Sequence, residues 1–179
     1  MHPDATQLGL ASFHRTLTVD TADAECLHDL TDDVQRFVDG CNVQSGLVIA
    51  QSLHTTAGLL LNERETGLQA DFREVADALV PRRRKYRHDD MTVRWENLCP
   101  EDFEAPNGHA HLQHALFGAP SITLPIADGQ MVLGRWQRLI LVEYDRPRRR
   151  RVHLQALGAP VPSRHLPAAE AAVVSQDVS

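Results

Sequence analysis

The sequence predicts one folded domain that combines strands with a few short helices, and three observations support this. Apolar and polar residues alternate over 12–19, whereas apolar residues recur with a helical period over 71–80. Asp128-Gly129 separates two β-rich stretches and is a strong signal for a two-residue hairpin. With 179 residues, 42% of them hydrophobic, the chain can bury one sizeable core, which we place within 1–158.

The first quarter of the chain predicts two strands and a short helix. Residues 12–19 are rich in β-formers and form the first strand, and a shorter strand lies around 25–29. Thr31 is the expected N-cap of a helix that ends at Gly40. The apolar side of this helix consists of Val34, Phe37 and Val38.

The middle of the chain predicts a buried strand, an extended segment and the clearest helix. Residues 46–53 are mostly apolar and read as a buried strand, and 59–61 continue extended toward Asn62-Glu63. A helix is expected over 71–80, ending before Pro81. Its apolar residues are Phe72, Val75, Ala76, Leu79 and Val80.

A polar connection without periodicity follows over 81–106, and segments of this kind within a domain are usually functional or mobile. Asn107 is a plausible N-cap for a helix that runs through Phe117 and is closed by Gly118. This helix is expected to turn Leu112, Ala115 and Leu116 toward the core.

The C-terminal part predicts β-structure. Residues 121–126 and 131–144 form strands on either side of the hairpin, and 150–157 form the last strand after a turn over 145–148. On the long second strand, one face is expected to carry Arg135, Gln137, Leu139, Leu141 and Glu143, and the other Trp136, Ile140, Val142 and Tyr144. Residues 159–179, rich in Pro and Ala, are expected to form a mobile tail.

Charge, hydropathy and cysteine content exclude several classes of protein. A net charge of −6 and a pI near 5.9 argue against general nucleic-acid binding. No apolar run is long enough for a membrane helix, and the start of the sequence lacks the order of a signal peptide, so a cytoplasmic protein is expected. The three cysteines, Cys26, Cys41 and Cys99, are widely spaced and are expected to be reduced thiols.

Two basic runs, 82–85 and 146–151, stand out on this acidic chain. They suggest a confined anion site at least as much as a nucleic-acid face, and a solvated run of charges is the alternative.

The histidines are the main candidates for a site. Three of the ten, His109, His111 and His114, lie within six residues, and His54 and His88 lie in other polar segments. Together they predict a metal or phosphate site. On a helix, the side chains of residues two positions apart, such as His109 and His111, point about 200° from each other. Either His109 therefore lies in a frayed first turn or only His111 is a ligand.

Simpler interpretations stay open for each of these histidines. His54 could be a satisfied core histidine, His88 could belong to an ordinary polar loop, and His114 is expected to be a surface histidine.

An ordered series of residues between about 12 and 158 resembles the YjbQ family, the secondary thiamine-phosphate synthases. The series is His54-Thr55-Thr56-Ala57, Asn62-Glu63, Asp71, Pro81, Tyr86-x-His88-Asp89, Asn107-x-His109-Ala110-His111-Leu112, Gly118, Pro125-Ile126, Gly129, Leu133-Gly134-x-Trp136-Gln137 and Asp145-x-Pro147-Arg148-x-Arg150. Arg146 departs from the usual glycine before Pro-Arg, and 95–106 looks like a lengthened loop.

The resemblance implies a YjbQ-like α+β fold dominated by antiparallel sheet, assembled as a homotrimer with a metal-binding pocket. His54, His88 and His111 match the family positions expected to bind metal, and His109 is carried over more weakly. Thr55, Glu63, Gln137 and Arg148 match positions of less certain role.

We therefore expect a metal-binding enzyme that joins a pyrimidine diphosphate to a thiazole phosphate and releases pyrophosphate. A divalent ion, zinc-like or magnesium, and arginines would neutralise the leaving group. The candidate catalytic residues are Glu63, Asp89 and Gln137, and the candidate substrate-binding residues are Thr55, Thr56, Arg148 and Arg150.

Two other functions remain open. The first is a metal-dependent hydrolase of a phosphorylated metabolite. The second is a non-catalytic ligand-binding trimer in which the histidines hold a structural metal. All three functions imply a small phosphorylated ligand or a metal, and neither nucleic acid nor membrane as partner.

Overall fold

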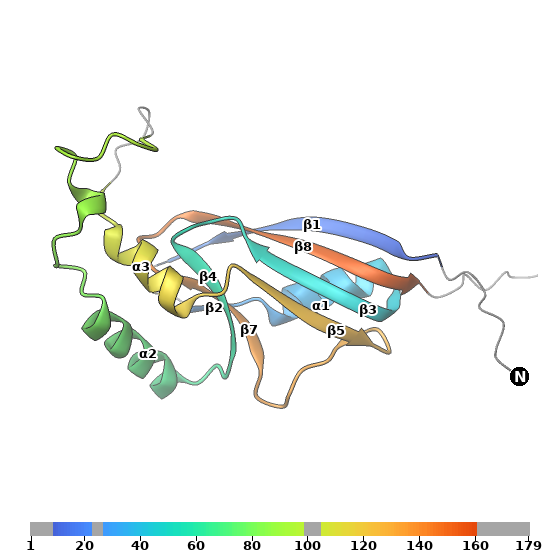
Figure 1. Cartoon of the computed structure of the whole chain (residues 1–179). Helices are drawn as coiled ribbons and strands as arrows, with labels where there is room; N and C mark the ends of the chain where they lie inside the picture. The colour runs from blue at the N-terminus through green and yellow to red at the C-terminus, as the bar shows by residue number, and fades with distance from the viewer. Residues whose placement is uncertain (1–8, 23–26, 99–104, 161–179) are drawn as a thin grey trace, which may run out of the picture.

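A computed structural model describes residues 9–22, 27–98 and 105–160 of the 179, and it contains two antiparallel sheets (Figure 1). A five-stranded sheet has the order β1-β8-β3-β5-β6, and a three-stranded sheet has the order β2-β7-β4. The elements in chain order are β1 (Ala11–Asp20), β2 (Leu27–Asp29), α1 (Thr31–Cys41), β3 (Val43–Ser52), β4 (Ala57–Asn62), α2 (Thr66–Leu79), the 3-10 turn η1 (Arg87–Asp89), α3 (Gly108–Phe117), β5 (Ser121–Ala127), β6 (Gln130–Met131), β7 (Arg138–Glu143) and β8 (Arg149–Pro160). The expected α+β fold with mainly antiparallel sheet is confirmed.

The hydrophobic core lies between the two sheets and α1. Val38 of α1, Val48 of β3 and Leu141 of β7 belong to the same buried cluster. Successive residues of β7 point to opposite faces, so Ile140 and Val142 join a second cluster on the other side of the three-stranded sheet. Phe72 of α2 and Ala110 of α3 cover that side. The three-stranded sheet is therefore packed on both faces.

The predicted hairpin is confirmed, but the long strand after it is not continuous. Asp128 and Gly129 both have positive φ, at 51° and 77°, as a tight hairpin of this type requires. The strand expected over 131–144 is divided into β6 and β7 by a loop. In this loop the side chain of Gln137 accepts a hydrogen bond from the backbone N–H of Gly134 at 2.7 Å. The expected faces hold only within β7.

Helix α1 begins and ends differently from the prediction. Leu30 occupies the N-cap position, and the carboxylate of Asp29 accepts the N–H of Thr31 at 2.9 Å. The Thr31 hydroxyl instead accepts the N–H of Leu139 and so ties the helix to β7. Gly40 lies inside the helix, and Asn42, with φ of 54°, ends it in the left-handed conformation.

Helices α2 and α3 form where the sequence predicts helices, but they bury fewer apolar residues than expected. Helix α2 begins at Thr66 because the Glu65 carboxylate accepts the N–H groups of Gly67 and Leu68. Its Val75 and Leu79 are exposed. On α3 the expected core residues Leu112, Ala115 and Leu116 are also exposed, and the buried ones are Gly108, His109, Ala110 and Gln113. The prediction of the buried face of α3 was wrong.

The C-terminal strand is longer than predicted. Strand β8 pairs with β3 up to Pro160, so Ala159 and Pro160 do not belong to a tail. Residues 161–179, like Cys26, Cys99 and the start of the second expected strand, lie outside the described residues. Cys41 is a buried free thiol. Within the described ranges, no helix has the length and apolar character needed to cross a membrane.

Candidate functional site

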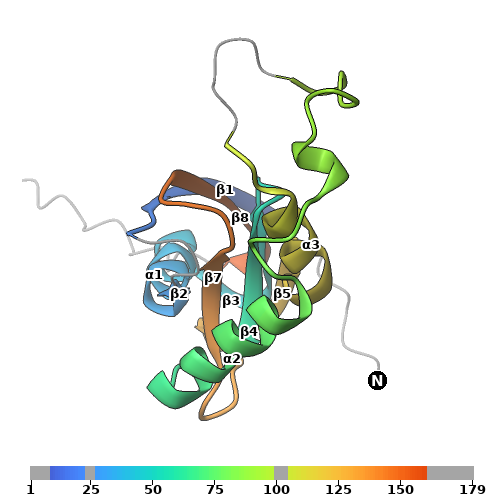
Figure 2. The ribbon, with the colours of Figure 1, turned by 90° about the vertical axis from the view of Figure 1, so that its left-hand side faces the viewer.

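The candidate site is a hollow of about 700 Å³ between α3, η1 and the loop that follows η1. Figures 1 and 2 show this loop projecting from the body of the molecule beyond α3. The hollow is lined by Thr55, Arg87, His88, Val93, Arg94, Trp95, Glu96, Asn97 and His111. It brings together three predicted site residues, Thr55, His88 and His111, from segments that are distant in the sequence.

The two imidazoles in the hollow lie against each other. The ring centroids of His88 and His111 are 4.4 Å apart, with an angle of 55° between the ring planes. His88 lies on η1 and His111 in the first half of α3. Their proximity therefore depends on how η1 is held at the start of α3.

Asp89 holds η1 against α3. One oxygen of its carboxylate accepts the backbone N–H of Asn107 at 2.9 Å and that of Gly108 at 2.8 Å. These N–H groups begin α3 and have no partner within the helix, so Asp89 acts as a cap supplied from a distant segment. The Asn107 side chain forms no capping hydrogen bond. Asp89, predicted to be catalytic, thus has a clear positioning role.

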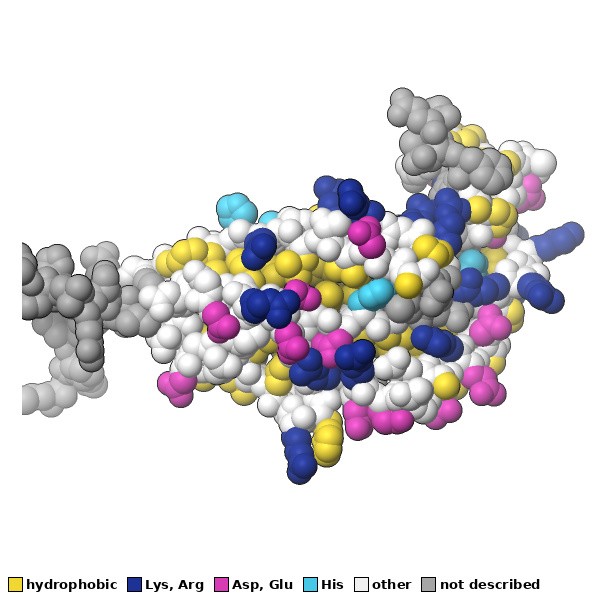
Figure 3. Space-filling view, turned by 180° about the vertical axis from the view of Figure 1, so that it is seen from behind, with side chains coloured by type: hydrophobic (Ala, Val, Ile, Leu, Met, Phe, Trp, Pro, Cys, Tyr) yellow, Lys and Arg dark blue, Asp and Glu magenta, His cyan; other side chains and the backbone are white. Residues whose placement is uncertain are grey.

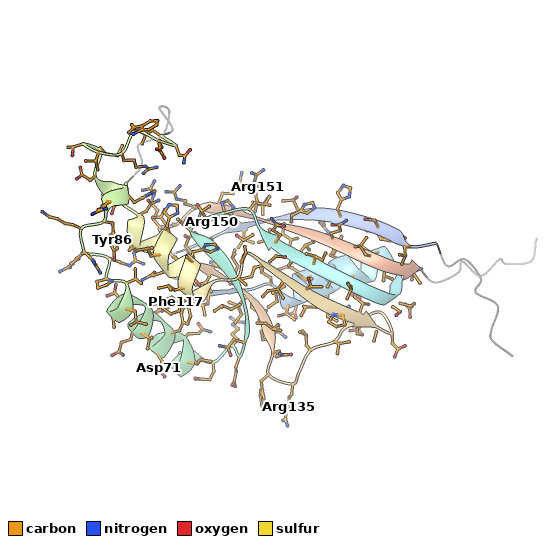
Figure 4. The ribbon with its side chains drawn as sticks, in the orientation of Figure 1. Asp71, Tyr86, Phe117, Arg135, Arg150 and Arg151 are labelled. Atoms are coloured by element: carbon orange, nitrogen blue, oxygen red, sulfur yellow. The ribbon has the colours of Figure 1, made fainter. Side chains whose placement is uncertain are left out.

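Gly108 allows the close approach of the two segments. A Cβ atom at this position would lie 2.7 Å from the Cβ of Tyr86 and 3.2 Å from the Cβ of His88. Figure 4 shows Tyr86 on the segment between α2 and η1, beside α3. A residue with a side chain at position 108 would therefore push η1 and His88 away from α3.

Arg94 gives the projecting loop its shape. Its guanidinium donates hydrogen bonds to the backbone carbonyls of His88, Glu96 and Asn97, at 3.2 to 3.3 Å. It also lies 3.2 Å from Nε2 of His88. Because arginine only donates, Nε2 of His88 is the acceptor in this hydrogen bond. Trp95 is 78% exposed and lies at the rim of the hollow.

His54 lies outside the group of imidazoles. Its Nε2 accepts the backbone N–H of Arg151 at 2.7 Å. Burial lowers its pKa, and the positive charge of Arg150 lowers it further, so His54 is held neutral with its proton on Nδ1. In the part of the chain that is described, no three His, Cys, Asp or Glu side chains are close enough to hold a metal ion. One chain therefore does not form the expected three-histidine site.

Glu63 and Gln137 lie far from the hollow within one chain. Asn62 pairs with Arg138 at one end of the β4–β7 ladder, and Ala57 pairs with Glu143 at the other end, beside Thr56. Five residue steps along a strand span about 17 Å. Glu63 is exposed, and Gln137 closes the loop before β7. Neither residue joins His88 and His111 in the same chain.

Arg150 is engaged inside the protein. It is 3% exposed and forms a bidentate ion pair with the fully buried Glu143, and its Nη2 donates to the Thr56 hydroxyl at 3.0 Å. Thr21 also donates to Glu143, at 3.1 Å. Arg150, labelled in Figure 4, and Thr56 thus belong to a buried polar network, which does not fit the expected contact with phosphate.

Arg148 is also paired within the chain. Its guanidinium lies 2.7 Å from the carboxylate of Asp145, which in turn lies 3.4 Å from the Asn107 amide nitrogen. Arg148 therefore supports the start of α3.

Of the other two histidines of α3, His109 is buried and His114 is partly buried. His109 is only 6% exposed. The ring of His114 lies against Gly58 and Gly118, where a Cβ atom would approach its Cδ2 to 2.7 and 3.1 Å, and it contacts Tyr144 edge-on. Burial lowers the pKa of His114 and raises that of the buried Tyr144. The prediction that His114 is a surface histidine was wrong.

Six residues of the hollow were not among the predicted site residues: Arg87, Val93, Arg94, Trp95, Glu96 and Asn97. They all lie in the long connection without periodicity. Its length was the only sequence signal that pointed to them.

Comparison with known proteins identifies the family. The sequence profile of the family described as "UPF0047 protein YjbQ-like" matches residues 15–159. A UPF0047 protein of Archaeoglobus fulgidus is 38% identical over 141 residues, which cover 79% of this chain and 98% of that protein.

Solved structures agree. A crystal structure from Sulfolobus solfataricus, described as a YbjQ-like protein of unknown function, is similar with a TM-score of 0.72 and 28% identity, over 84% of this chain and 99% of that one. A hypothetical protein from Aeropyrum pernix gives a TM-score of 0.70 at 30% identity, over 82% and 98% of the two chains. The chain thus belongs to the YjbQ/UPF0047 family.

Proposed function

We propose that the hollow binds a phosphorylated small metabolite and that the protein is a transferase of the thiamine-phosphate synthase type. The observation that carries this proposal is the convergence of Thr55, His88 and His111 with the exposed Arg87 on one hollow. A guanidinium, a hydroxyl and two imidazoles are groups that bind phosphate oxygens and transfer protons.

The proposed reaction forms one bond and breaks one. The ring nitrogen of the thiazole phosphate attacks the methylene carbon of the pyrimidine diphosphate, and the C–O bond to the diphosphate breaks. Pyrophosphate leaves with the electron pair. Arg87, in place of Arg148 and Arg150, would offset the charge that develops on this leaving group. His111 would donate a proton to the leaving oxygen, and Trp95 would stack on a heteroaromatic ring.

A divalent ion, zinc-like or magnesium, remains part of the proposal, although the described residues of one chain do not fit a complete site for it. Further ligands would have to come from a neighbouring subunit. Metal analysis of the purified wild type and of a His54→Ala/His88→Ala/His111→Ala variant tests this. Equal metal content in the two proteins would contradict it.

The reaction is tested by supplying both heterocycles, separately and together, and measuring thiamine phosphate and pyrophosphate. A synthase releases pyrophosphate only when both substrates are present, whereas a hydrolase consumes the pyrimidine diphosphate alone. We expect Arg87→Gln and His111→Gln to reduce the rate by about 10²-fold or more. Arg36→Gln, which changes an exposed arginine of α1, is the matched control and should keep the wild-type rate.

We also propose that the chain assembles as a homotrimer. Leu112 and Leu116 on α3 and Val75 and Leu79 on α2 are exposed apolar side chains on helices, and burial against another copy would stabilise them. Sedimentation equilibrium should give three chains per particle. The Leu112→Glu/Leu116→Glu variant should shift the particle toward the monomer. A monomeric wild type would contradict the proposal.

A further inference from the structure

A second hollow, of about 520 Å³, lies on the segment that joins α2 to η1. It is lined by three cationic side chains, Arg84, Lys85 and Arg87, together with Tyr86, Asp89 and Asp90. Figure 3 shows Lys and Arg side chains, with some acidic ones, at the end of the molecule that carries this segment. The basic run 82–85, which the proposed reaction does not use, contributes two of the three cations.

The segment that carries these cations has a defined shape. The hydroxyl of Tyr86 donates to the carbonyl of Pro81 at 2.7 Å, and the backbone N–H of Arg84 donates to the same oxygen at 3.2 Å. Asp89 anchors the other end of the segment to α3. The three cations are therefore presented from a closed turn that is fixed at both ends.

The two carboxylates of the hollow are already occupied by uncharged donors. Asp89 accepts the N–H groups of Asn107 and Gly108. Asp90 accepts the hydroxyl of Thr92 at 2.6 Å and its N–H at 3.0 Å, and these hydrogen bonds lower the pKa of Asp90. Within the described ranges, none of the exposed Arg84, Lys85 and Arg87 forms an ion pair or a side-chain hydrogen bond. Among the described residues, these three cations therefore have no ion-pair partner, although the charge of Lys85 also helps to lower the pKa of Asp90 and Arg84 lies 6.0 Å from the centroid of the Tyr86 ring.

We propose that this hollow is a second anion site, separate from the hollow that contains His88 and His111, and that it binds a diphosphate or a similarly small polyphosphate. Three like charges within four residues repel one another, and a multivalent anion removes this repulsion through charge-assisted hydrogen bonds. A chain with a net charge of −6 offers no general attraction for such an anion, so binding must come from the local cluster. Arg87 lines both hollows, which places the anion next to the candidate site. The proposal does not depend on the reaction proposed above.

The test is calorimetric titration of the whole chain with inorganic pyrophosphate. We expect saturable binding of pyrophosphate, weaker binding of orthophosphate, and a decline in affinity as salt is raised. The Arg84→Gln/Lys85→Gln variant, which keeps the shared Arg87, should lose about tenfold or more in affinity. The matched control Arg36→Gln/Arg135→Gln removes the same charge at two exposed positions elsewhere and should bind as the wild type does. In a His111→Gln/Trp95→Ala variant of the candidate site, the pyrophosphate binding that depends on Arg84 and Lys85 should remain.

Several results would overturn the proposal. They are an absence of saturable binding by the wild type, an equal loss in the matched control, or a loss confined to the His111→Gln/Trp95→Ala variant, which would place the anion in the candidate site. Tighter binding of a short single-stranded oligonucleotide than of pyrophosphate would point to a nucleic-acid face instead. Because catalysis is not measured, failure of the proposed reaction would leave this result unaffected.

Discussion

Two glycines allow the imidazoles of α3 to lie where they do. Gly108 lets Tyr86 and His88 approach the start of the helix, and Gly58 makes room for the ring of His114 near its end. Neither glycine has a positive φ, so both are needed for space and not for backbone conformation. The requirement for a small residue can therefore be tested directly by adding a methyl group.

Gly108→Ala should destabilise the protein by about 1–3 kcal/mol, because the new Cβ overlaps atoms close to the backbone of η1. It should also weaken ligand binding in the hollow, since His88 moves with η1. Urea denaturation measures the first effect. Gly40→Ala is the control, because a Cβ there meets nothing within 4 Å and alanine favours a helix. Equal stability of Gly108→Ala and wild type would show that the two segments are not in close contact.

Stability should fall in mild acid because His54 and His114 are held neutral. Burial lowers the pKa of both below the ordinary value near 6.5, so the unfolded chain binds protons at a higher pH than the folded one. The contribution of these two neutral histidines to the free energy of unfolding is fully present above about pH 6.5, the ordinary pKa of histidine. It is lost as the pH falls from there through the lower pKa values of the folded state. Urea midpoints measured between about pH 8 and pH 5 should show this decline. The decline should be smaller in His54→Gln/His114→Gln, and an unchanged slope in that variant would contradict the assignment.

Among the secondary-structure elements, α3 depends on a cap that its own sequence does not provide. Asp89→Ala should cost about 0.5–2 kcal/mol, because two N–H groups at the start of the helix lose their acceptor. Asp89→Asn keeps an oxygen acceptor and should therefore cost clearly less than Asp89→Ala. Thermal or urea denaturation measures both variants.

The same pair of variants separates the positioning role of Asp89 from the predicted catalytic role. If Asp89 acts by positioning, Asp89→Asn should keep most of the activity, whereas Asp89→Ala should lose it. If Asp89→Asn were as inactive as Asp89→Ala while remaining as stable as the wild type, the carboxylate charge itself would be required.

Most elements could be predicted from local patterns, but their buried faces could not. The Asp128-Gly129 hairpin and α2 follow from turn chemistry and helical periodicity. The buried face of α3 is set by partners distant in sequence: the amide of Gln113 donates to the carbonyl of Val80, which places a polar residue inside and leaves Leu116 exposed. The break before β7 similarly involves Arg138, which pairs with Asp29 and Asp32. Contacts of this kind are invisible to a periodicity argument.

For the molecule as a whole, the ion pair between Glu143 and Arg150 is a buried polar link between the two sheets. Glu143 ends β7 of the three-stranded sheet, and Arg150 lies in β8 of the five-stranded sheet. The Thr21 hydroxyl donates to Glu143, and the Thr56 hydroxyl accepts from Arg150. The network therefore joins segments from four parts of the chain, and its Thr56 is adjacent in sequence to Thr55 of the candidate site.

Arg150→Met should destabilise the protein by about 3–5 kcal/mol, because it leaves the carboxylate of Glu143 buried without its partner. Glu143→Gln/Arg150→Met should lose much less, since no uncompensated charge remains. The neighbouring Arg149 pairs with Asp20 at the surface, so Arg149→Met should change stability little. Urea denaturation of the three variants checks this, and similar stability of Arg150→Met and Arg149→Met would refute it.

The candidate site could be predicted in part. Thr55, His88 and His111 were identified from residue type and position, and the fold brings them together. The sequence could not show that Glu63 and Gln137 lie at the opposite end of the β4–β7 ladder, because strand pairing decides this. The sequence also could not show that Arg150 pairs with a buried carboxylate and not with phosphate. The partner, Glu143, is seven residues away on another strand.

The manner in which Arg94 holds its loop has a consequence for divergence within the family. Its guanidinium donates hydrogen bonds to the backbone carbonyl oxygens of His88, Glu96 and Asn97. Every amino acid has such an oxygen. The identity of the side chain at the rim, here Trp95, can therefore be exchanged without loss of the scaffold. Substitutions at position 95 could therefore change which ligand is preferred while His88 and His111 stay in place.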